Sequence, residues 1–410
     1  MRCRRTNNIA RLGLAAGAGA LLATAGSGCG QSSSTRTTAT PTAIVATSPT
    51  GSASASPLAS AAASGRWSIV TSPAPDGHLY GAACAGAGDC WAVGEGTAGV
   101  LIEQDTGSGW STVLGPNPPG TAMDWLQAVA CGTAGDCWAV GTANGNPPEP
   151  VIEQETGSGW SIVPSPISPG SPQSELNDVT CVSAGDCWAV GADDSAGTTL
   201  IEQYASSGWI MVSSPNPSGS GGSLSGVTCV SASDCWAVGA QSGGGATLGT
   251  LIEQYTGGGW TIVPSPGPSD SDGSQLNAVA CVSASACWTV GHDAADEEPL
   301  IEQYSGGTWS IVASPPASGS GDYALSGIAC ANAGDCWAVG GDNMTGSPQS
   351  LIEQYAGSGW SIVDSPNPST GSNLGAVTCV SSQECWAVGV SGIEGDPSHA
   401  LIEQYSPPSS

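Results

Sequence analysis

The sequence predicts an all-β fold, a seven-bladed β-propeller with four strands in each blade, from three observations. First, a pair of cysteines six residues apart recurs seven times, at intervals of 47 to 52 residues, which is within the range of four-stranded propeller blades. Second, each unit contains four short strand-like segments separated by clusters of Gly, Ser and Pro, as between Leu276 and Pro315. Third, the repeat region does not begin and end at the boundaries of a unit.

The two ends of the repeat region complement each other. The region opens with a lone copy of the fourth strand, from Trp67 to Val70, and it closes with a lone third strand, from Leu401 to Tyr405. Because the last unit has no fourth strand of its own, we expect the segment from Trp67 to Val70 to join the C-terminal blade and close the ring. Closure removes the open sheet edges that an unclosed array would expose. The propeller is therefore predicted to span residues 67–410.

The repeated unit resembles known propeller families. Its four strands and its phase look like those of kelch and WD-repeat propellers. The turn into the fourth strand, DTGSGW from Asp105 to Trp110, is similar to the Asp-box hairpin of the BNR-repeat class, with Glu155 in place of Asp105 in the second unit and Tyr in later ones. The unit also resembles a group of uncharacterised exported bacterial repeat proteins. These resemblances imply a closed propeller and no particular activity.

The first 66 residues differ from the repeats in composition. Residues 1–28 are typical of an export signal, with a basic start and the short apolar stretch LGLAAGAGALLATAG. The following GSGCG resembles the lipobox of bacterial lipoproteins, which would make Cys29 the lipidated first residue; cleavage after Ala25 would instead release a soluble protein. Residues 29–66, rich in Ser, Thr, Ala and Pro, are predicted to form a disordered tether. We expect the domain outside the cytoplasm, lipid-anchored on the outer face of the cell membrane or secreted.

The charge distribution excludes several functions. All 34 Asp and Glu lie after Arg66, which is the last of the six basic residues, so residues 67–410 carry a net charge of −34. Such a surface repels nucleic acid and anionic lipid. We therefore expect no nucleic-acid partner, and membrane contact only through the lipid anchor. Asp-box sialidases bind their substrate carboxylate with an arginine cluster, which this domain lacks.

Each cysteine pair is predicted to form a disulfide across a hairpin. A five-residue loop between the first and second strands places the two cysteines at opposed positions, within disulfide range. Zinc sites prefer two to four intervening residues, and redox sites need a shorter spacing and a basic neighbourhood. The predicted bonds are Cys84–Cys90, Cys131–Cys137, Cys181–Cys187, Cys229–Cys235, Cys281–Cys287, Cys330–Cys336 and Cys379–Cys385.

Three further repeated residue types are expected to be structural. Fourteen of the fifteen tryptophans occupy two fixed positions, and alternation along the strand separates Trp236 from Cys235, so the bulky face of one blade can pack on the small face of the next. The aspartate before the second cysteine, such as Asp234, is expected to cap its own hairpin loop. The glutamates of the repeated IEQ motif are expected to be buried capping groups with hydrogen bonds or raised pKa values; they are Glu103, Glu153, Glu202, Glu253, Glu302, Glu353 and Glu403.

Loop lengths predict one uniform and one diversified face of the ring. The first-to-second and third-to-fourth connections are constant in length, whereas the other two connections vary. Because binding residues concentrate on variable loops, we expect a protein or glycan ligand there. The candidate binding residues are His78, Asp124, Trp125, Asp322, Tyr323 and His399. The loop GHDAADEEP offers a possible calcium site, with Asp293, Asp296, Glu297 and Glu298 as candidate ligands.

The leading functional hypothesis is a non-enzymatic binding or scaffold protein, monomeric and tethered to the cell surface. The alternative is an extracellular carbohydrate-active enzyme that uses two carboxylates, since suitable Asp and Glu residues are present although no spacing singles out a pair. A purely structural wall component is a third option. Fold analogy does not choose among them.

If the acidic loop at residues 291–299 binds calcium, a chelator should lower the melting temperature of the domain, because a ligand bound only to the folded state stabilises it. Thermal unfolding followed with and without chelator at low ionic strength measures this. An unchanged melting temperature would rule calcium out.

Overall fold

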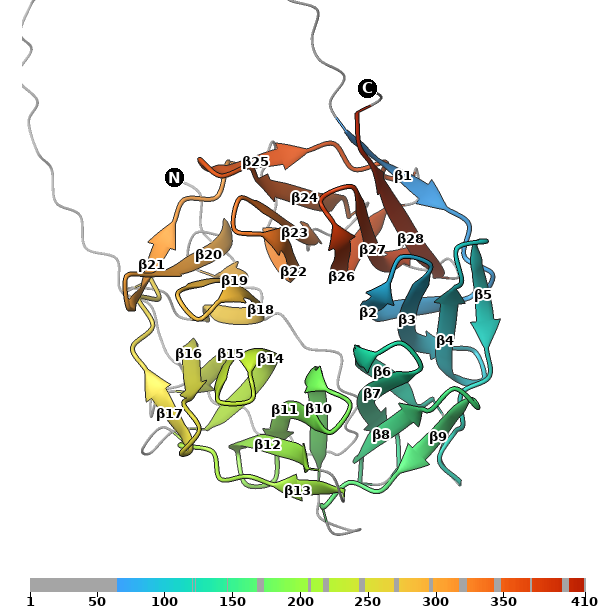
Figure 1. Ribbon diagram of the computed structural model, residues 1–410, viewed down its shortest axis with the longest axis horizontal. Coiled ribbons are helices and arrows are strands. Elements are labelled where there is room, and N and C mark those ends of the chain that lie inside the picture. Colours follow the sequence, from blue (N-terminus) through green and yellow to red (C-terminus); the bar gives the residue numbers. More distant parts are fainter. Residues whose placement is uncertain are drawn as a thin grey trace, which may run out of the picture. The chain divides into compact units, whose positions relative to one another are not determined.

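The computed structural model describes most of residues 65–408 as a ring of seven antiparallel sheets of four strands each (Figure 1). The described segments are 65–119, 121, 123–145, 147–167, 173–205, 208–216, 221–242, 248–268, 273–294, 298–316, 323–342, 348–368, 371–392 and 398–408. Their regular structure is entirely β-strand, so the predicted all-β seven-bladed propeller is confirmed. The predicted export signal, Cys29 and nearly all of the predicted tether lie outside the described residues.

We number the blades 1 to 7 from β2 onward, so that blade 7 combines β26, β27 and β28 with β1. The innermost strands surround the central opening in Figure 1; they are β2 (Gly77–Gly86), β6 (Trp125–Thr133), β10 (Ser174–Ser183), β14 (Gly222–Ser231), β18 (Gln275–Ser283), β22 (Tyr323–Asn332) and β26 (Ser372–Ser381). The second strands are β3 (Asp89–Gly96), β7 (Asp136–Ala143), β11 (Asp186–Asp193), β15 (Asp234–Ser242), β19 (Ala286–Asp293), β23 (Asp335–Asp342) and β27 (Glu384–Ser391).

The outer half of each blade carries the IEQ motif and a tryptophan. The third strands are β4 (Gly99–Asp105), β8 (Glu149–Glu155), β12 (Thr198–Ala205), β16 (Leu248–Tyr255), β20 (Glu298–Ser305), β24 (Ser350–Tyr355) and β28 (His399–Ser406). The outermost strands are β1 (Arg66–Val70), β5 (Trp110–Val113), β9 (Trp160–Val163), β13 (Trp209–Met211), β17 (Trp260–Val263), β21 (Thr308–Val312) and β25 (Trp360–Val363).

The ring closes through the N-terminal strand, as the phase of the repeats predicts. β1 pairs antiparallel with β28, with Trp67 opposite Tyr405 and Val70 opposite Ile402. The two strands lie side by side at the top of Figure 1. The indole of Trp67 then packs edge-to-face on Trp337 of blade 6, at 5.2 Å between ring centroids. The first and last strands of the domain therefore complete one sheet and seal one blade junction.

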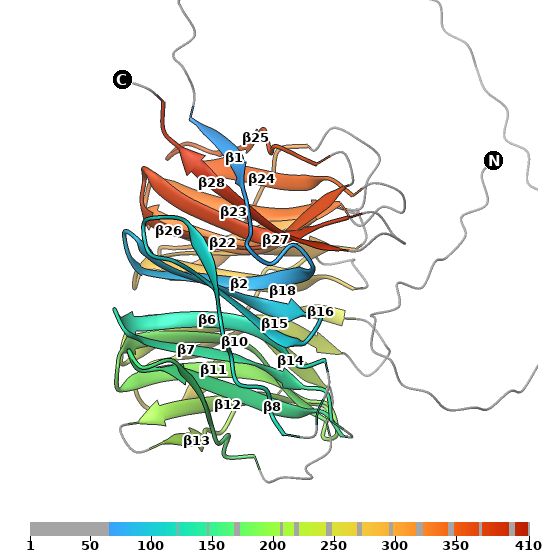
Figure 2. The same cartoon turned by 90° about the vertical axis from the view of Figure 1, so that its right-hand side faces the viewer.

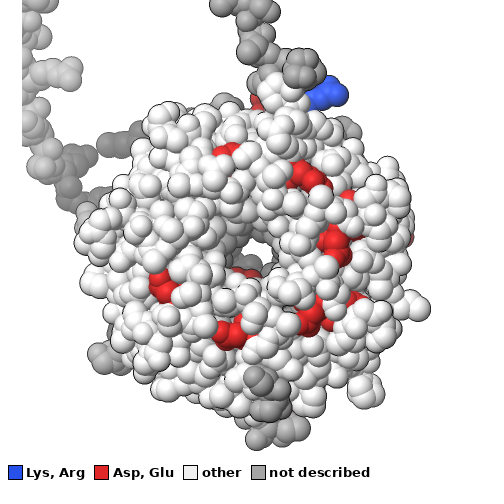
Figure 3. Space-filling model, in the orientation of Figure 1, with Lys and Arg blue, Asp and Glu red and all other residues white. Residues whose placement is uncertain are grey.

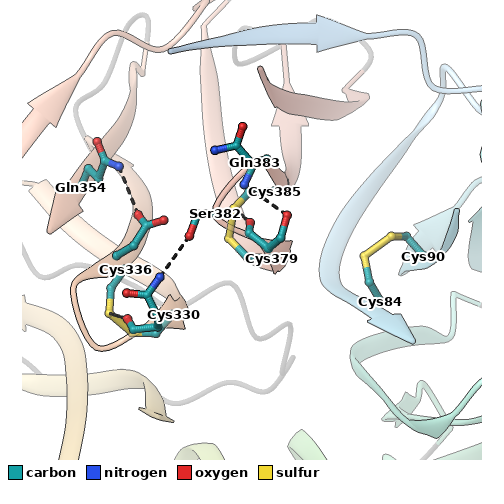
Figure 4. Close-up of a disulfide and its surroundings, with 12 residues drawn as sticks. Cys84, Cys90, Cys330, Cys336, Gln354, Cys379, Ser382, Gln383 and Cys385 are labelled. Atoms are coloured by element: carbon teal, nitrogen blue, oxygen red, sulfur yellow. Dashed lines mark hydrogen bonds between the residues drawn. A yellow bond between two sulfur atoms is a disulfide. The ribbon is translucent and has the colours of Figure 1, made fainter. Parts of the chain in front are cut away.

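All seven predicted disulfides are present, and each bridges the hairpin between the first and second strands of its blade. The two cysteines are directly opposed in the strand register, as for Cys131 and Cys137, and their Cα atoms lie 4.0–4.1 Å apart. Figure 4 shows three of these hairpins. The second cysteine of every pair is fully buried.

Blades pack bulky face on small face, as the alternation predicts. Trp138 and Val140 of blade 2 lie in one core cluster with Cys187 and Ala189 of blade 3. The tryptophan of the outermost strand completes each junction: seven Trp–Trp pairs have centroids 5.2–5.4 Å apart and interplanar angles of 80–88°. Edge-to-face packing of aromatic rings is favourable beyond the apolar area that it buries.

A bulge in the innermost strand explains the glycine of the repeated WAVG motif. In blade 2 the register shifts between Leu126 and Ala128, opposite Gly141. A Cβ atom on Gly141 would lie 2.1 Å from the carbonyl oxygen of Trp125, and the equivalent distance is 1.9–2.0 Å in the other blades. No side chain fits there, so this position requires glycine in every blade.

The aspartate before the second cysteine does not cap its hairpin loop, contrary to the expectation from the sequence. In blade 6, Asp335 accepts a hydrogen bond from the side chain of Gln354 on the third strand (Figure 4). The loop is capped instead from its own start, where Asn332 accepts a hydrogen bond from the backbone N–H of Gly334. Ser231, Ser283 and Ser381 cap their loops in the same way. The aspartate links strands because the glutamine, which is paired with Trp337 in the register, lies diagonally across from it on the neighbouring strand.

The connections divide the ring into two faces. Because neighbouring strands are antiparallel, the disulfide hairpins and the third-to-fourth turns share one face, which we call the hairpin face. The other connections share the opposite face, which we call the variable face; the two faces form the left and right sides of the ring in Figure 2. Among the described residues, no helix is long and apolar enough to cross a membrane.

Replacing Trp67 by Ala should lower the free energy of unfolding by about 3–5 kcal/mol, the usual cost of removing a large buried aromatic side chain. The side chain is 4% exposed and contacts both Trp337 and Tyr405. Ile69→Ala on the same strand is the control, because Ile69 is 47% exposed, and it should cost below about 1 kcal/mol. Equal effects of the two substitutions in denaturant unfolding would contradict closure by β1.

Candidate functional site

Five blade junctions contain a tyrosine that fills the space beside the second-strand tryptophan. In blade 3, Tyr204 lies at the end of the third strand and packs on Trp138 of blade 2, with ring centroids 4.5 Å apart. The same contact recurs at 4.7–4.8 Å for Tyr255, Tyr304, Tyr355 and Tyr405 with Trp188, Trp236, Trp288 and Trp337. The tyrosine position is therefore part of the common inter-blade core.

Blades 1 and 2 lack this tyrosine. Asp105 and Glu155 stand at the position, and each uses one carboxylate oxygen to accept hydrogen bonds from two glycine N–H groups in its own turn. A carboxylate engaged in this way supplies no ring for the neighbouring tryptophan. The tryptophans that have lost the tyrosine, Trp386 and Trp91, are each 4% exposed, against 0–2% for the other five at this position. The inter-blade packing is therefore thinner at these two junctions.

An open cavity of about 560 Å³ lies at the junction of blades 1 and 2 on the hairpin face. This volume falls in the range of small-molecule binding pockets. Glu155 lies in its wall, where the other junctions have tyrosine. The remaining lining residues are Gly88, Asp89, Trp91, Gln104, Val113, Gly135, Gly157, Gly159 and Trp160. We call this cavity the blade 1–2 pocket.

Two polar side chains in the blade 1–2 pocket have no partner of their own. In four other blades the strand-three glutamine donates to the aspartate before the second cysteine at 3.1–3.4 Å. Asp89 and Gln104 are the corresponding pair in blade 1. Within the described part of the chain, neither side chain makes a hydrogen bond to the other or to any other group. Both are therefore available to a ligand.

The electrostatic setting of the pocket is entirely acidic. Asp89 and Glu155 both line it, and the domain after Arg66 contains no Lys or Arg. Figure 3 views this face and shows acidic side chains around the central opening, with basic atoms only at the outer margin. Anionic ligands are therefore disfavoured here, whereas neutral and cationic ligands are not.

Buried carboxyls tie successive blades together away from this pocket. Each IEQ glutamate is fully buried. In six blades it accepts a hydrogen bond, at 2.7–3.2 Å, from a serine that follows the outermost strand of the preceding blade. Burial raises the pKa values of these six glutamates, although the hydrogen bond from the serine opposes the shift. The pKa rises from 4.5 to about 7 for Glu202, Glu253, Glu302, Glu353 and Glu403. The expectation that these glutamates are structural is supported.

Glu153 in blade 2 is the exception. Gly115 occupies the place of the serine in blade 1, and neither carboxyl oxygen of Glu153 has a hydrogen-bond partner among the described residues. Burial, and then the charge of Asp124, raise its pKa to about 8. Asp124 itself is 1% exposed and accepts hydrogen bonds from the hydroxyl of Thr121 and the N–H of Asn144. Asp124, predicted as a binding residue, is thus enclosed.

The other predicted binding residues lie in several blades. In blade 1, Nδ1 of His78 lies 3.1 Å from the hydroxyl of Tyr80, which donates to Glu95 at 2.8 Å. Burial and the Glu95 carboxylate raise the pKa of Tyr80 well above its usual value. Nδ1 of His399 donates to the Pro75 carbonyl. Trp125 and Tyr323 begin β6 and β22 and are half-buried, while Asp322 lies outside the described residues.

The predicted calcium loop is only partly described. Asp293 is 9% exposed and accepts a hydrogen bond from Ser274, and it lies opposite the exposed Glu298 in the strand register. Asp296 and Glu297 are outside the described residues. In the part of the chain that the structure describes, no three His, Cys, Asp or Glu side chains are grouped to bind a metal. Calcium binding by this loop stays a prediction.

Asp89, Gln104 and Glu155 were not predicted from the sequence to line a pocket. Their signal was present in the repeat, because Glu155 and Asp105 break the run of tyrosines at one position. The loss of the hydrogen bond between Asp89 and Gln104 has no such signal, since the same residue pair occurs in blades where the bond forms.

Comparisons with known proteins support the fold. No protein-family model matches the chain, and no curated protein sequence is similar to it. The GH74 xyloglucanase from Xanthomonas campestris is 13% identical with a TM-score of 0.53, over 80% of this chain and 54% of that chain. The chain thus spans about half the length of that enzyme.

Two further solved structures are more distant. The six-bladed fucose-binding lectin of Aleuria aurantia is 13% identical with a TM-score of 0.47, over 71% of this chain and 97% of that chain. A subtype N10 neuraminidase-like protein of a strain named for the little yellow-shouldered bat is 12% identical with a TM-score of 0.41, over 68% of this chain and 93% of that chain. The likeness to the xyloglucanase, at 13% identity, shows the fold alone, and the subclass with kelch-like or Asp-box repeats stays a prediction.

The domain should lose stability as the pH rises from about 4.5 to about 8. Burial raises the pKa of six IEQ glutamates, all except Glu103, from 4.5 to about 7 or about 8 in the folded state, so they release their protons at higher pH there than in the unfolded chain. The unfolded state therefore binds fewer protons in this interval, and the free energy of unfolding falls with rising pH. Melting temperatures measured from pH 5 to pH 9 test this.

The substitution Glu153→Gln tests the effect of the IEQ carboxyl that has no hydrogen-bond partner among the described residues. At pH 9 the variant should melt at a higher temperature than the wild type, because it removes a buried charge that no hydrogen bond stabilises; at pH 5 the two should be similar. Glu202→Gln is the matched control and should gain less, since Ser165 stabilises the Glu202 carboxylate. An equal gain in both variants would contradict the special position of Glu153.

Proposed function

We propose that this chain is an exported, surface-tethered, non-enzymatic binding protein that holds its ligand in the blade 1–2 pocket. Seven disulfides indicate a non-reducing compartment outside the cytoplasm for the folded domain. The proposed route there is export by residues 1–28, followed by anchoring through Cys29 and the tether at residues 29–66, or secretion of the monomer if Cys29 is not lipidated.

The observation that carries the proposal is the departure of the pocket from the repeat. A tyrosine would fill this space, as it does at five other junctions, but Glu155 replaces it. The cavity that results has two indole walls and two side chains, Asp89 and Gln104, that lack partners within the described residues. Aromatic side chains beside a few polar groups that can orient a ligand are typical of ligand sites. Rigid, disulfide-bonded blades on both sides hold these groups in place.

A non-catalytic role agrees with the state of the carboxyls. A glycosidase needs an accessible carboxyl with a raised pKa to protonate the leaving group. The IEQ glutamates have raised pKa values, but their side chains are 0% exposed in the blade interiors. The alternative of a carbohydrate-active enzyme is favoured by one observation, the presence of two carboxylates, Asp89 and Glu155, in the same cavity.

The substitution Glu155→Tyr tests the proposal, because it gives this junction the residue found at the other five. The introduced phenol ring should pack on Trp91 and fill the pocket, so the melting temperature should not fall. The turn does not need the glutamate, since Gly257 and Gly259 adopt the same left-handed conformation after Tyr255 as Gly157 and Gly159 do after Glu155. Ligand binding should weaken at least about tenfold, equivalent to about 1.4 kcal/mol.

Wild type and Glu155→Tyr should be compared on a glycan array and on a panel of small amines and short peptides, with Tyr204→Phe at the next junction as the control that retains binding. Ligands bound equally by both proteins would place binding elsewhere, for instance on the variable face, and overturn the proposed location. Release of reducing sugar from a bound glycan, abolished by Asp89→Asn, would favour the enzyme alternative.

A further inference from the structure

We infer that the blade 1–2 pocket takes the charged end of an organic cation, an amine or a guanidine, with the carbon stem of the ligand against the two indoles. This inference rests on the proposed binding function and specifies the ligand class. Three features of the protein support it: the hydrogen-bonding groups of the pocket, the exposure of its tryptophans and the net charge of the domain.

The pocket offers more acceptors than donors. Asp89 contributes a carboxylate without a hydrogen bond among the described residues, and Glu155 uses only Oε1 on the glycine N–H groups of its turn. Gln104 adds an amide that has lost the aspartate partner present in four other blades. An ammonium group has three donors and a guanidinium group five, and neither has an acceptor. Charge-assisted bonds to carboxylates are the stronger class of hydrogen bond.

The aromatic walls fit a narrow stem better than a flat ring. Trp91 and Trp160 pack edge-to-face at 5.2 Å and are only 4% and 8% exposed. A sugar ring stacks on an open indole face, and neither tryptophan exposes enough of its surface for such stacking. A methylene chain is narrower than a sugar ring and needs a smaller area of contact with the exposed edges of the indoles. The missing tyrosine leaves the space that such a stem would occupy.

No cation of the domain itself satisfies this site. The domain after Arg66 has no basic residue except three histidines, and its net charge is −34. Arg66 lies on β1, the outermost strand of blade 7, and belongs to a different blade junction. The electrostatic field of the domain therefore attracts cations from solution. In the blade 1–2 pocket, carboxylates and indoles line the same cavity and can contact one bound cation.

The same chemistry has two sources, a free small amine and the lysine or arginine side chain of a partner protein. Isothermal titration with n-butylamine, and with the peptide acetyl-Gly-Lys-Gly-amide, distinguishes them. The Nε-acetylated peptide is the uncharged control of the same length. Binding of n-butylamine without binding of the lysine peptide supports a free amine; binding of the lysine peptide, but not of its acetylated form, supports a partner side chain.

Three variants test the role of the carboxylates, and each of them removes one negative charge. Asp89→Asn and Glu155→Gln should each weaken cation binding at least about tenfold, whereas Asp234→Asn, at the same hairpin position in blade 4, should leave it within about twofold. Glu155→Gln keeps an oxygen that accepts the turn hydrogen bonds, so the fold is retained. Affinity should fall as salt is added, because salt screens the charges.

Different results would overturn the inference about the ligand class and the proposed binding function. If the acetylated and free peptides bind equally, or if neither amine probe binds while a neutral glycan binds in a Glu155→Tyr-sensitive manner, the ligand is not a cation, although the proposed binding function stands. If no glycan, amine or peptide distinguishes wild type from Glu155→Tyr, the proposed function itself fails. A loss of affinity in Asp234→Asn as large as in Asp89→Asn would also overturn the inference.

Discussion

The packing of the second-strand tryptophan against the next blade is the interaction on which the rest of the structure depends. This indole contacts the small Cys and Ala face of its neighbour and meets a second indole edge-to-face, and in five junctions a tyrosine covers it as well. A chain without Phe builds its core from these rings. Each disulfide fixes the hairpin that carries the tryptophan, and the last junction is sealed only when β1 pairs with β28.

Departures from this common junction coincide at one place in the ring. Between blades 1 and 2, Gly115 removes the serine partner of Glu153, and Glu155 removes the tyrosine that would cover Trp91. Both changes cost stability, because one leaves a buried carboxyl without a partner and the other thins the apolar packing. Local costs of this kind are typical of functional sites. Five other junctions show how the same residues are arranged when both the serine and the tyrosine are present, whereas the junction of blades 7 and 1 lacks the tyrosine but keeps the serine, Ser72.

The acidity of the domain has two different structural origins. The IEQ glutamates belong to the interior, where enclosure raises their pKa values and serine hydroxyls link six of them to the preceding blade. They therefore contribute less negative charge to the folded protein than the sequence suggests. Other carboxylates belong to the hairpin face, where four aspartates accept hydrogen bonds from glutamines and Asp89 does not. This second group includes Asp89, which lines the blade 1–2 pocket.

The sequence by itself determined the number of blades, the cysteine pairing and the closure by residues 67–70, because each is a periodic or end-to-end pattern along the chain. It also determined that the IEQ glutamates are structural, but not that serines 31 to 39 residues away hold six of them. The aspartates were wrongly expected to cap their loops, since only the sheet register brings the glutamine of the neighbouring strand to a diagonal position within hydrogen-bond distance. The sequence shows that Glu155 interrupts the run of tyrosines, but only the tertiary structure shows that a pocket results, because the pocket forms where two blades meet.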